Sequence, residues 1–135
     1  MNRRKLREQI FKLLFGIEFN DKEEMALQTK LFFEQEENAA DEQDTAYITN
    51  KCNDIIAHME EIDKVINQAA EGWTTKRMAK VELTLIRIAV YEIQYDEEVP
   101  TNVAINEAVE LSKKFGQDVS ASFVNGVLAR VVKKD

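Results

Sequence analysis

The sequence predicts an all-α protein, built as a single compact domain of about seven helices that covers residues 1–135. The chain has the length of one domain, and with 44% hydrophobic and 32% charged residues it has the composition of a soluble globular protein. One Pro and four Gly leave few breaks for strands and turns, which favours helices. Apolar residues also recur at steps of three and four, as on the buried face of a helix.

The N-terminal third is predicted to contain two helices and a loop. The first helix, 3–18, carries an apolar stripe formed by Leu6, Ile10, Leu13, Leu14 and Ile17. A second stripe lies roughly 120° around the helix and is formed by Arg4, Arg7, Phe11 and Phe15. This second stripe indicates a binding surface, although its two aromatic residues also fit a wider core stripe. A short helix is expected over 22–34, and the acidic segment 34–44 lacks periodicity, which predicts a solvated loop.

The segment 45–70 is helical in pattern, with apolar residues spaced alternately by four and three. These residues are Ile48, Cys52, Ile55, Met59, Ile62, Ile66 and Ala69. The spacing allows one helix of about 26 residues with a coiled-coil-like seam, but the seam is short for a coiled coil and also fits the core of a helical bundle. The pattern alone leaves open whether 45–70 forms one helix or two.

The segment after Gly72 begins with a connector over 73–78, which holds Trp73, the only tryptophan in the sequence. Residues 78–94 are apolar almost all the way round, which predicts the buried central helix of the fold. Charged groups inside a buried helix need partners or an exit to solvent. In this segment these are Glu82, Arg87 and Glu92.

The last part of the chain is predicted to form two more helices after a turn at 96–100. They cover 102–115 and 120–133, with Ser120 as the N-cap of the second. Gly126 lies inside that last helix, where Gly costs about 1 kcal/mol relative to Ala. Its presence indicates either close packing against another helix or a flat surface kept open for a ligand.

Charge is distributed unevenly along the chain. The net charge of −7 argues against nucleic acid as a partner. Residues 1–12, however, hold five basic residues against Glu8 alone, a local excess of +4, whereas 18–44 hold ten acidic residues against two lysines, an excess of −8. Because salt screens charges over about 8 Å, the local field at the N-terminus decides what binds there.

The sequence gives no indication of an enzyme. With one Cys and one His, neither a disulfide within the chain nor a zinc site can form, and Cys52 is expected to be a small buried hydrophobic residue. No Gly-rich phosphate loop or Gly-x-Ser-x-Gly motif is present, and the paired carboxylates fall in polar runs. We therefore expect no catalytic residues and no cofactor. No apolar run is long enough for a membrane span or a signal peptide, so a cytoplasmic protein is expected.

Three segments, in this order, resemble the signature of the NusB family of transcription antitermination proteins. They are VELTLIRIAVYE (81–92), VPTNVAINEAVELS (99–112) and SASFVNGVL (120–128). The resemblance extends over nearly the whole chain and is weakest between residues 20 and 70. It implies two small helical bundles and no catalytic activity. It also implies binding to boxA-type single-stranded RNA together with NusE, the small-subunit ribosomal protein, within a complex of other Nus factors and RNA polymerase that promotes antitermination and ribosomal RNA transcription.

The resemblance assigns RNA contacts to two places. The basic start of the chain matches the arginine-rich start of the family and consists of Arg3, Arg4, Lys5 and Arg7. These residues would neutralise RNA phosphates, which is a salt-sensitive and largely sequence-independent contribution. Phe123, which begins the Phe-Val-Asn-Gly-Val motif, matches a position tied to RNA binding and would stack on an unpaired base.

The resemblance also assigns Phe15 and Glu82 to the NusE interface. Phe15 would supply apolar area there, and Glu82 would pair with a basic residue of NusE. It implies a break near 57–62 that would divide the segment 45–70 into two helices. Two departures from the family pattern affect how tightly the protein would bind RNA without NusE. Phe15 stands where relatives often have Tyr, and 120–122 is Ser-Ala-Ser where some relatives are basic.

Other interpretations of the sequence stay open. A helical protein–protein interaction module without RNA binding fits the second stripe of the first helix equally well. The NusB-like domain of RNA cytosine methyltransferases shares the signature, but the sequence contains no cofactor-binding α/β segment. A homodimer that hides the RNA face also fits, and the pattern fixes neither the exact RNA sequence nor the affinity without NusE.

Overall fold

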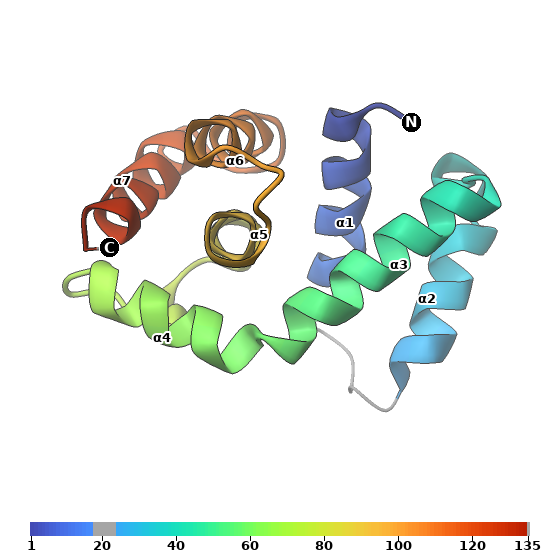
Figure 1. Cartoon of the computed structure of the whole chain (residues 1–135), viewed down its shortest axis with the longest axis horizontal. Helices are drawn as coiled ribbons and strands as arrows, with labels where there is room; N and C mark the ends of the chain where they lie inside the picture. The colour runs from blue at the N-terminus through green and yellow to red at the C-terminus, as the bar shows by residue number, and fades with distance from the viewer. Residues whose placement is uncertain (18–23, 135) are drawn as a thin grey trace. The chain divides into compact units, whose positions relative to one another are not determined.

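The computed structural model describes residues 1–17 and 24–134, and every regular element in this part of the chain is helical (Figure 1). Seven α-helices and two short 3-10 helices are described: α1 (Arg3–Ile17), α2 (Met25–Glu34), η2 (Glu36–Asn38), α3 (Glu42–Ala57), α4 (Met59–Ala69), η3 (Thr75–Arg77), α5 (Lys80–Tyr95), α6 (Thr101–Phe115) and α7 (Ser120–Lys134). The predicted all-α class is confirmed. The predicted end of the first helix at 18 and the start of the second at 22 lie outside the described residues.

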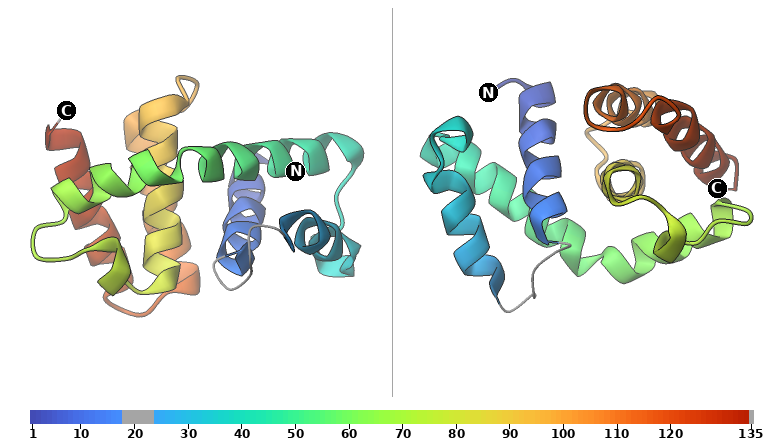
Figure 2. Two further views of the ribbon diagram at one scale, coloured as in Figure 1. Left: turned by 90° about the horizontal axis from the view of Figure 1, so that it is seen from below. Right: turned by 180° about the vertical axis from the view of Figure 1, so that it is seen from behind.

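The first of two compact units spans residues 1–56 and contains the neighbouring helices α1, α2 and α3 (Figure 2). Its buried apolar side chains come from α1 and α3: Ile10, Phe11, Leu13, Leu14, Ile48, Cys52 and Ile55. The Cys52 Sγ lies 3.8 Å from the Ile10 carbonyl oxygen, so the small thiol sits against the α1 backbone. Burial raises the pKa of this thiol, which confirms Cys52 as a buried hydrophobic residue. Helix α2, in contrast, buries none of its ten residues.

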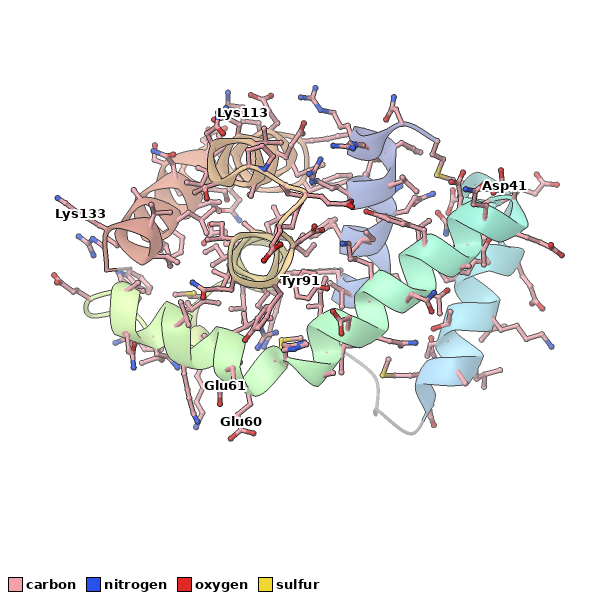
Figure 3. The ribbon with its side chains drawn as sticks, viewed as in Figure 1. Asp41, Glu60, Glu61, Tyr91, Lys113 and Lys133 are labelled. Atoms are coloured by element: carbon pink, nitrogen blue, oxygen red, sulfur yellow. The ribbon has the colours of Figure 1, made fainter. Side chains whose placement is uncertain are left out.

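The expected loop over 34–44 is wrong in its second half, because α3 already begins at Glu42. Asp41 caps this helix, since its Oδ1 accepts a hydrogen bond of 2.7 Å from the Asp44 backbone N–H (Figure 3). Glu42 and Asp44 in the first turn also suit the positive end of the helix dipole. The acidic residues that suggested a solvated loop therefore mark the start of a helix.

The segment 45–70 contributes to two helices, α3 and α4, rather than one. The break falls at His58, whose backbone angles are φ −100° and ψ 5° and whose carbonyl oxygen accepts a 2.9 Å bond from Ile62 N–H. Six of the seven apolar seam residues are buried, and the exception is Met59. The bundle-core interpretation and the break near 57–62 are confirmed, and a continuous coiled-coil-like helix is excluded.

The second unit spans residues 57–135, and its described helices α4, α6 and α7 surround α5, which Figure 1 shows end-on. Nine of the ten consecutive residues from Leu83 to Glu92 are buried in α5, and the exception is Arg87. The prediction of a central buried helix is therefore confirmed. Among the described residues, no helix combines the length and apolar character that a membrane span requires.

Arg87 shows how α5 accommodates charge within this packed unit. Its Nε and Nη2 donate to Asp63 Oδ1 and Oδ2 of α4 at 2.9 and 2.8 Å, a bidentate pair in which both side chains are mostly buried. Burial lowers the pKa of Arg87 and raises the pKa of Asp63 to about 6, while the charge of Lys80 opposes the shift at Asp63. The predicted need of Arg87 for a partner is thus met by α4.

Candidate nucleic-acid interface

The basic start of the chain forms the first turn of α1, and two contacts within the first unit hold it in place. The Asn2 Oδ1 accepts a 2.8 Å hydrogen bond from Lys5 N–H, which is an N-cap that satisfies one open amide. The Met1 amino group lies 2.9 Å from Asp44 Oδ2, so the terminus is tied to the first turn of α3. The hydrogen bond to Asp44 raises the pKa of the Met1 amino group, which keeps it charged. The cationic turn is therefore presented on a fixed helix.

The four predicted phosphate contacts differ in exposure. Arg3 and Arg4 are exposed, Lys5 is half-buried and Arg7 is only 8% exposed. Glu8, which is buried, lies 3.8 Å from Lys5 Nζ and 3.6 Å from Lys12 Nζ and offsets part of their charge. Arg3 and Arg4 are thus the basic residues of this turn whose side chains are most exposed to a ligand.

The second stripe of α1 divides between core and surface. Phe11 is 4% exposed and belongs to the core, whereas Phe15 is half-buried one turn further along. Their ring centroids lie 5.7 Å apart at an interplanar angle of 33°, so the ring of Phe11 packs against the ring of Phe15. The core interpretation is confirmed for Phe11, which is buried, whereas the binding role of the half-buried Phe15 stays a prediction.

Phe123 lies in the first turn of α7 in the second unit, where its side chain is half-buried. It meets Trp73, which precedes η3, with ring centroids 5.7 Å apart in an edge-to-face arrangement at 76°. The Arg77 guanidinium carbon lies 5.7 Å from the Trp73 ring centroid. The predicted base-stacking residue is therefore part of a cluster of two rings and one cation.

Glu82, the predicted charge partner of NusE, has a contact within its own unit. Its Oε1 accepts a 2.9 Å hydrogen bond from Ser120 Oγ, and Ser120 Oγ accepts a 2.9 Å bond from Gln117 N–H. Ser120 is thus the first residue of α7 but bonds back to Gln117, rather than capping the amides ahead of it as predicted. A Cβ at Gly116 would lie 2.6 Å from Ser120 Oγ, so a glycine is needed where the chain passes this junction.

Gly126 lies on an open part of the α7 surface. It is exposed, and a Cβ at this position would meet nothing within 4 Å. Close helix packing, one of the two explanations for a glycine here, is therefore wrong. Gly126 follows Phe123 by three residues and shares its side of the helix, so the surface beside the ring is flat.

The structure thus gathers the predicted site residues into two sets. Arg3, Arg4, Lys5, Arg7 and Phe15 share α1 in the first unit, and Glu82 and Phe123 belong to the junction of α5 and α7 in the second. Trp73 and Arg77 were missed as site residues, although their spacing of four residues matches one helical turn and could have indicated a ring–cation contact. Over the described part of the chain, no group of three or more His, Cys, Asp or Glu could hold a metal ion.

The comparison with known proteins rests on the sequence as a whole. The model of the NusB family matches residues 4–133. This chain belongs to the NusB family. The transcription antitermination protein NusB of Agathobacter rectalis is 53% identical over 130 residues, covering 96% of this chain and 98% of that protein. That of Lachnoclostridium phytofermentans is 45% identical over 132 residues, covering 98% and 99%.

Solved structures agree with this membership. The structure of T. maritima NusB matches with a TM-score of 0.84 and 30% identity, covering 99% of this chain and 92% of that one. A crystal structure of antitermination factors NusB and NusE in complex with double-stranded RNA matches with a TM-score of 0.79 over 98% and 97% of the chains. At 24% identity, this second likeness supports the NusB fold alone.

Proposed function

We propose that this protein is a transcription antitermination factor that binds boxA-type single-stranded RNA together with NusE and promotes ribosomal RNA transcription. The observation that carries the proposal is the capped first turn of α1, which presents Arg3 and Arg4 to solvent in a chain of net charge −7. Membership of the NusB family, whose curated relatives are named for antitermination, supports it. In this proposal the protein acts in the cytoplasm by binding and catalyses no reaction. It associates with RNA polymerase and other Nus factors as part of the assembled complex.

The proposed roles follow the exposure of each residue. Arg3 and Arg4 contact RNA phosphates directly, and Lys5 adds a weaker contribution because it lies near Glu8. Arg7, with little exposed surface, contributes positive potential to the same turn. Phe123 stacks on an unpaired base, since single-stranded RNA exposes ring faces that a duplex hides.

The proposed NusE contacts are Phe15 and Glu82. Phe15 offers exposed apolar surface supported by Phe11, and its lack of a hydroxyl makes the contact apolar throughout. Glu82 is half-buried, so the carboxylate that accepts from Ser120 keeps surface for a basic residue of NusE. We further propose that the two compact units act together as one domain, 1–135, which predicts a single unfolding transition by fluorescence and by circular dichroism.

The test is fluorescence anisotropy of a short boxA-like RNA, alone and with purified NusE, across a salt titration. Replacing Arg3 and Arg4 by Gln should lower the slope of log affinity against log salt by about 1.4, at about 0.7 per phosphate contact on a single strand. A matched control replaces Lys64 and Lys113 by Gln and so removes the same net charge. Both are exposed lysines, and each is paired with a Glu three residues away. The control variant should keep the slope of the wild-type protein.

Three results would overturn parts of the proposal. An unchanged slope in the arginine variant would remove the N-terminal assignment. Absence of RNA binding by a folded monomer, with NusE binding retained, would favour a module for protein–protein interaction. Absence of both, with a dimer in sedimentation, would indicate that a second copy covers the interface. Phe15→Ala should weaken the effect of NusE on RNA affinity while leaving binding of RNA alone unchanged.

A further inference from the structure

Trp73 is an exposed aromatic residue on a turn that the structure fixes on both sides. Gly72 adopts a φ of +78°, a conformation that favours glycine, and the Trp73 N–H donates a 3.0 Å bond to the Ala70 carbonyl oxygen. Two residues later, the buried Thr75 donates its N–H to Asn67 Oδ1 at 2.9 Å. Trp73 nevertheless keeps 48% of its surface exposed. A large ring held on an anchored turn and half exposed to solvent has apolar area that a ligand could bury favourably.

The residues around Trp73 restrict the kinds of ligand that could cover its ring. The ring meets Phe123 edge-to-face with centroids 5.7 Å apart, and the Arg77 guanidinium lies 5.7 Å from the Trp73 centroid. The two rings therefore stand at about a right angle and brace each other, and the cation orients the larger ring. Because Trp73 remains half exposed in this arrangement, it keeps ring area on which a further flat group can lie.

The chain segments that carry the two rings hold more basic than acidic residues. The segment 70–80 contains Glu71 against Lys76, Arg77 and Lys80, a local excess of +2. On α7, Arg130 lies seven residues after Phe123 and so on the same side of the helix, with the open surface of Gly126 between them. Lys76, Arg77 and Arg130 are exposed, and none forms an ion pair with a carboxylate among the described residues. Aromatic rings bordered by unpaired cations are what a single-stranded nucleic acid requires, since it offers bases to stack and phosphates to neutralise.

We propose that Trp73 and Phe123 together form a two-ring stacking site for one unpaired base of a single-stranded RNA, in which the base lies flat against one ring and meets the edge of the other, with Arg77 contacting the adjoining phosphate. The inference rests on the proposed RNA-binding function and extends it to Trp73 and Arg77. A protein ligand is less suited to this surface, because a flat glycine beside the rings and three cations around them offer few apolar partners. Stacking is tolerant of base identity, so this site contributes affinity more than sequence specificity.

The sole tryptophan makes the proposal directly measurable. Emission of Trp73 is recorded while a boxA-like single-stranded RNA is titrated into the complex with NusE, and the anisotropy of labelled RNA is followed in parallel. The Trp73→Phe protein, titrated identically, supplies the background from any other fluorophore. Stacking should quench Trp73 emission along the same binding curve that the anisotropy reports.

Affinity of variants gives an independent measure. Trp73→Ala should weaken RNA binding on the order of tenfold, within the range measured for base–aromatic stacks, whereas Trp73→Phe should stay within about threefold because a ring remains. Arg77→Gln should lower the salt slope by about 0.7. Tyr47→Ala is the matched control: Tyr47 is an exposed ring with the Lys51 ammonium 5.5 Å from its centroid, and its loss should leave affinity within twofold.

The outcomes separate this inference from the function on which it rests. If the wild-type protein binds RNA but Trp73 emission does not change and Trp73→Ala binds normally, the stacking site is refuted and the RNA-binding function stands. If emission changes on addition of NusE alone and not of RNA, the rings dock a protein and the inference is wrong. If no RNA binds under any condition, the proposed function fails and the stacking site fails with it. Equal losses in Trp73→Ala and Tyr47→Ala would also refute it.

Discussion

Replacing Glu82 by Ala tests whether this residue contributes to folding stability, to NusE binding, or to both. In the wild-type protein, Glu82 Oε1 accepts from Ser120 Oγ at 2.9 Å, and Ser120 is only 1% exposed. The substitution leaves a buried hydroxyl without its charged acceptor, although that hydroxyl keeps the bond it accepts from Gln117 N–H. A bond to a charged group contributes about 1.5–3 kcal/mol, and Glu82 is half exposed, so we expect a loss of about 2 kcal/mol.

This loss converts into a measurable shift in thermal stability. A chain of 135 residues has an unfolding entropy of about 0.3 kcal/mol/K near its melting temperature, so about 2 kcal/mol lowers Tm by about 7 °C. Thermal and urea unfolding followed by circular dichroism measure the change. Glu82→Gln keeps an acceptor oxygen in place and should lose less than about 1 kcal/mol, while removing the charge offered to NusE.

A double-mutant cycle with Ser120→Ala tests whether the hydrogen bond between Glu82 and Ser120 accounts for the loss of stability. If the bond carries the effect, the losses from Glu82→Ala and Ser120→Ala should fall short of additivity by about 1 kcal/mol or more. Additive losses, or a Glu82→Ala protein as stable as the wild type, would refute the structural role. Weaker NusE binding by Glu82→Gln at unchanged stability would then assign the charge to the partner.

Three further predictions concern stability and local motion. Arg87→Met leaves Asp63 half-buried without its guanidinium partner and should cost about 2 kcal/mol in urea unfolding at pH 8. Because burial raises the folded-state pKa of Asp63 to about 6, above its ordinary value, that loss should shrink as pH falls from 7 towards 4, and a loss that grows with acid would contradict this account. Gly126→Ala should raise the unfolding free energy by about 1 kcal/mol, since a Cβ there meets nothing within 4 Å, and a destabilised variant would indicate unseen packing. Amides of α2 should exchange with deuterium fastest among the α-helices, because α2 buries no side chain, and protection equal to that of α5 would exclude this.

The order and approximate extent of the helices could be predicted because each buries a regular stripe. The apolar run in α5 predicted a central position correctly, since a helix without a polar face is stable only when other elements bury it on all sides. The start of α3 differs from the prediction because acidic residues favour both a solvated loop and the first turn of a helix. Asp41, followed three residues later by Asp44, is also an N-cap pattern, and that pattern prevails in the structure.

The candidate site was less predictable, for a physical reason. Residues on one helix, such as Phe11 and Phe15, can be placed from periodicity, so their shared face was foreseen. Trp73 and Phe123 are fifty positions apart and meet only because the turn before η3 reaches the first turn of α7, which local pattern does not encode. The bond between Glu82 and Ser120 likewise depends on how α5 and α7 are brought together.

The first turn of α1 departs from a local rule that three other helices follow. Three other helices begin with acidic residues that suit the positive end of the dipole. Helix α3 has Glu42, α5 has Glu82, and α4 has Glu60 and Glu61, both labelled in Figure 3. Helix α1 has no acid in its first turn and begins with three cations instead. At a few tenths of a kcal/mol or more for each unfavourable charge, this arrangement weakens the helix. A bound polyanion would reverse the sign of the same interactions, so under the RNA binding that we propose the turn that costs stability in the free protein would become favourable in the complex.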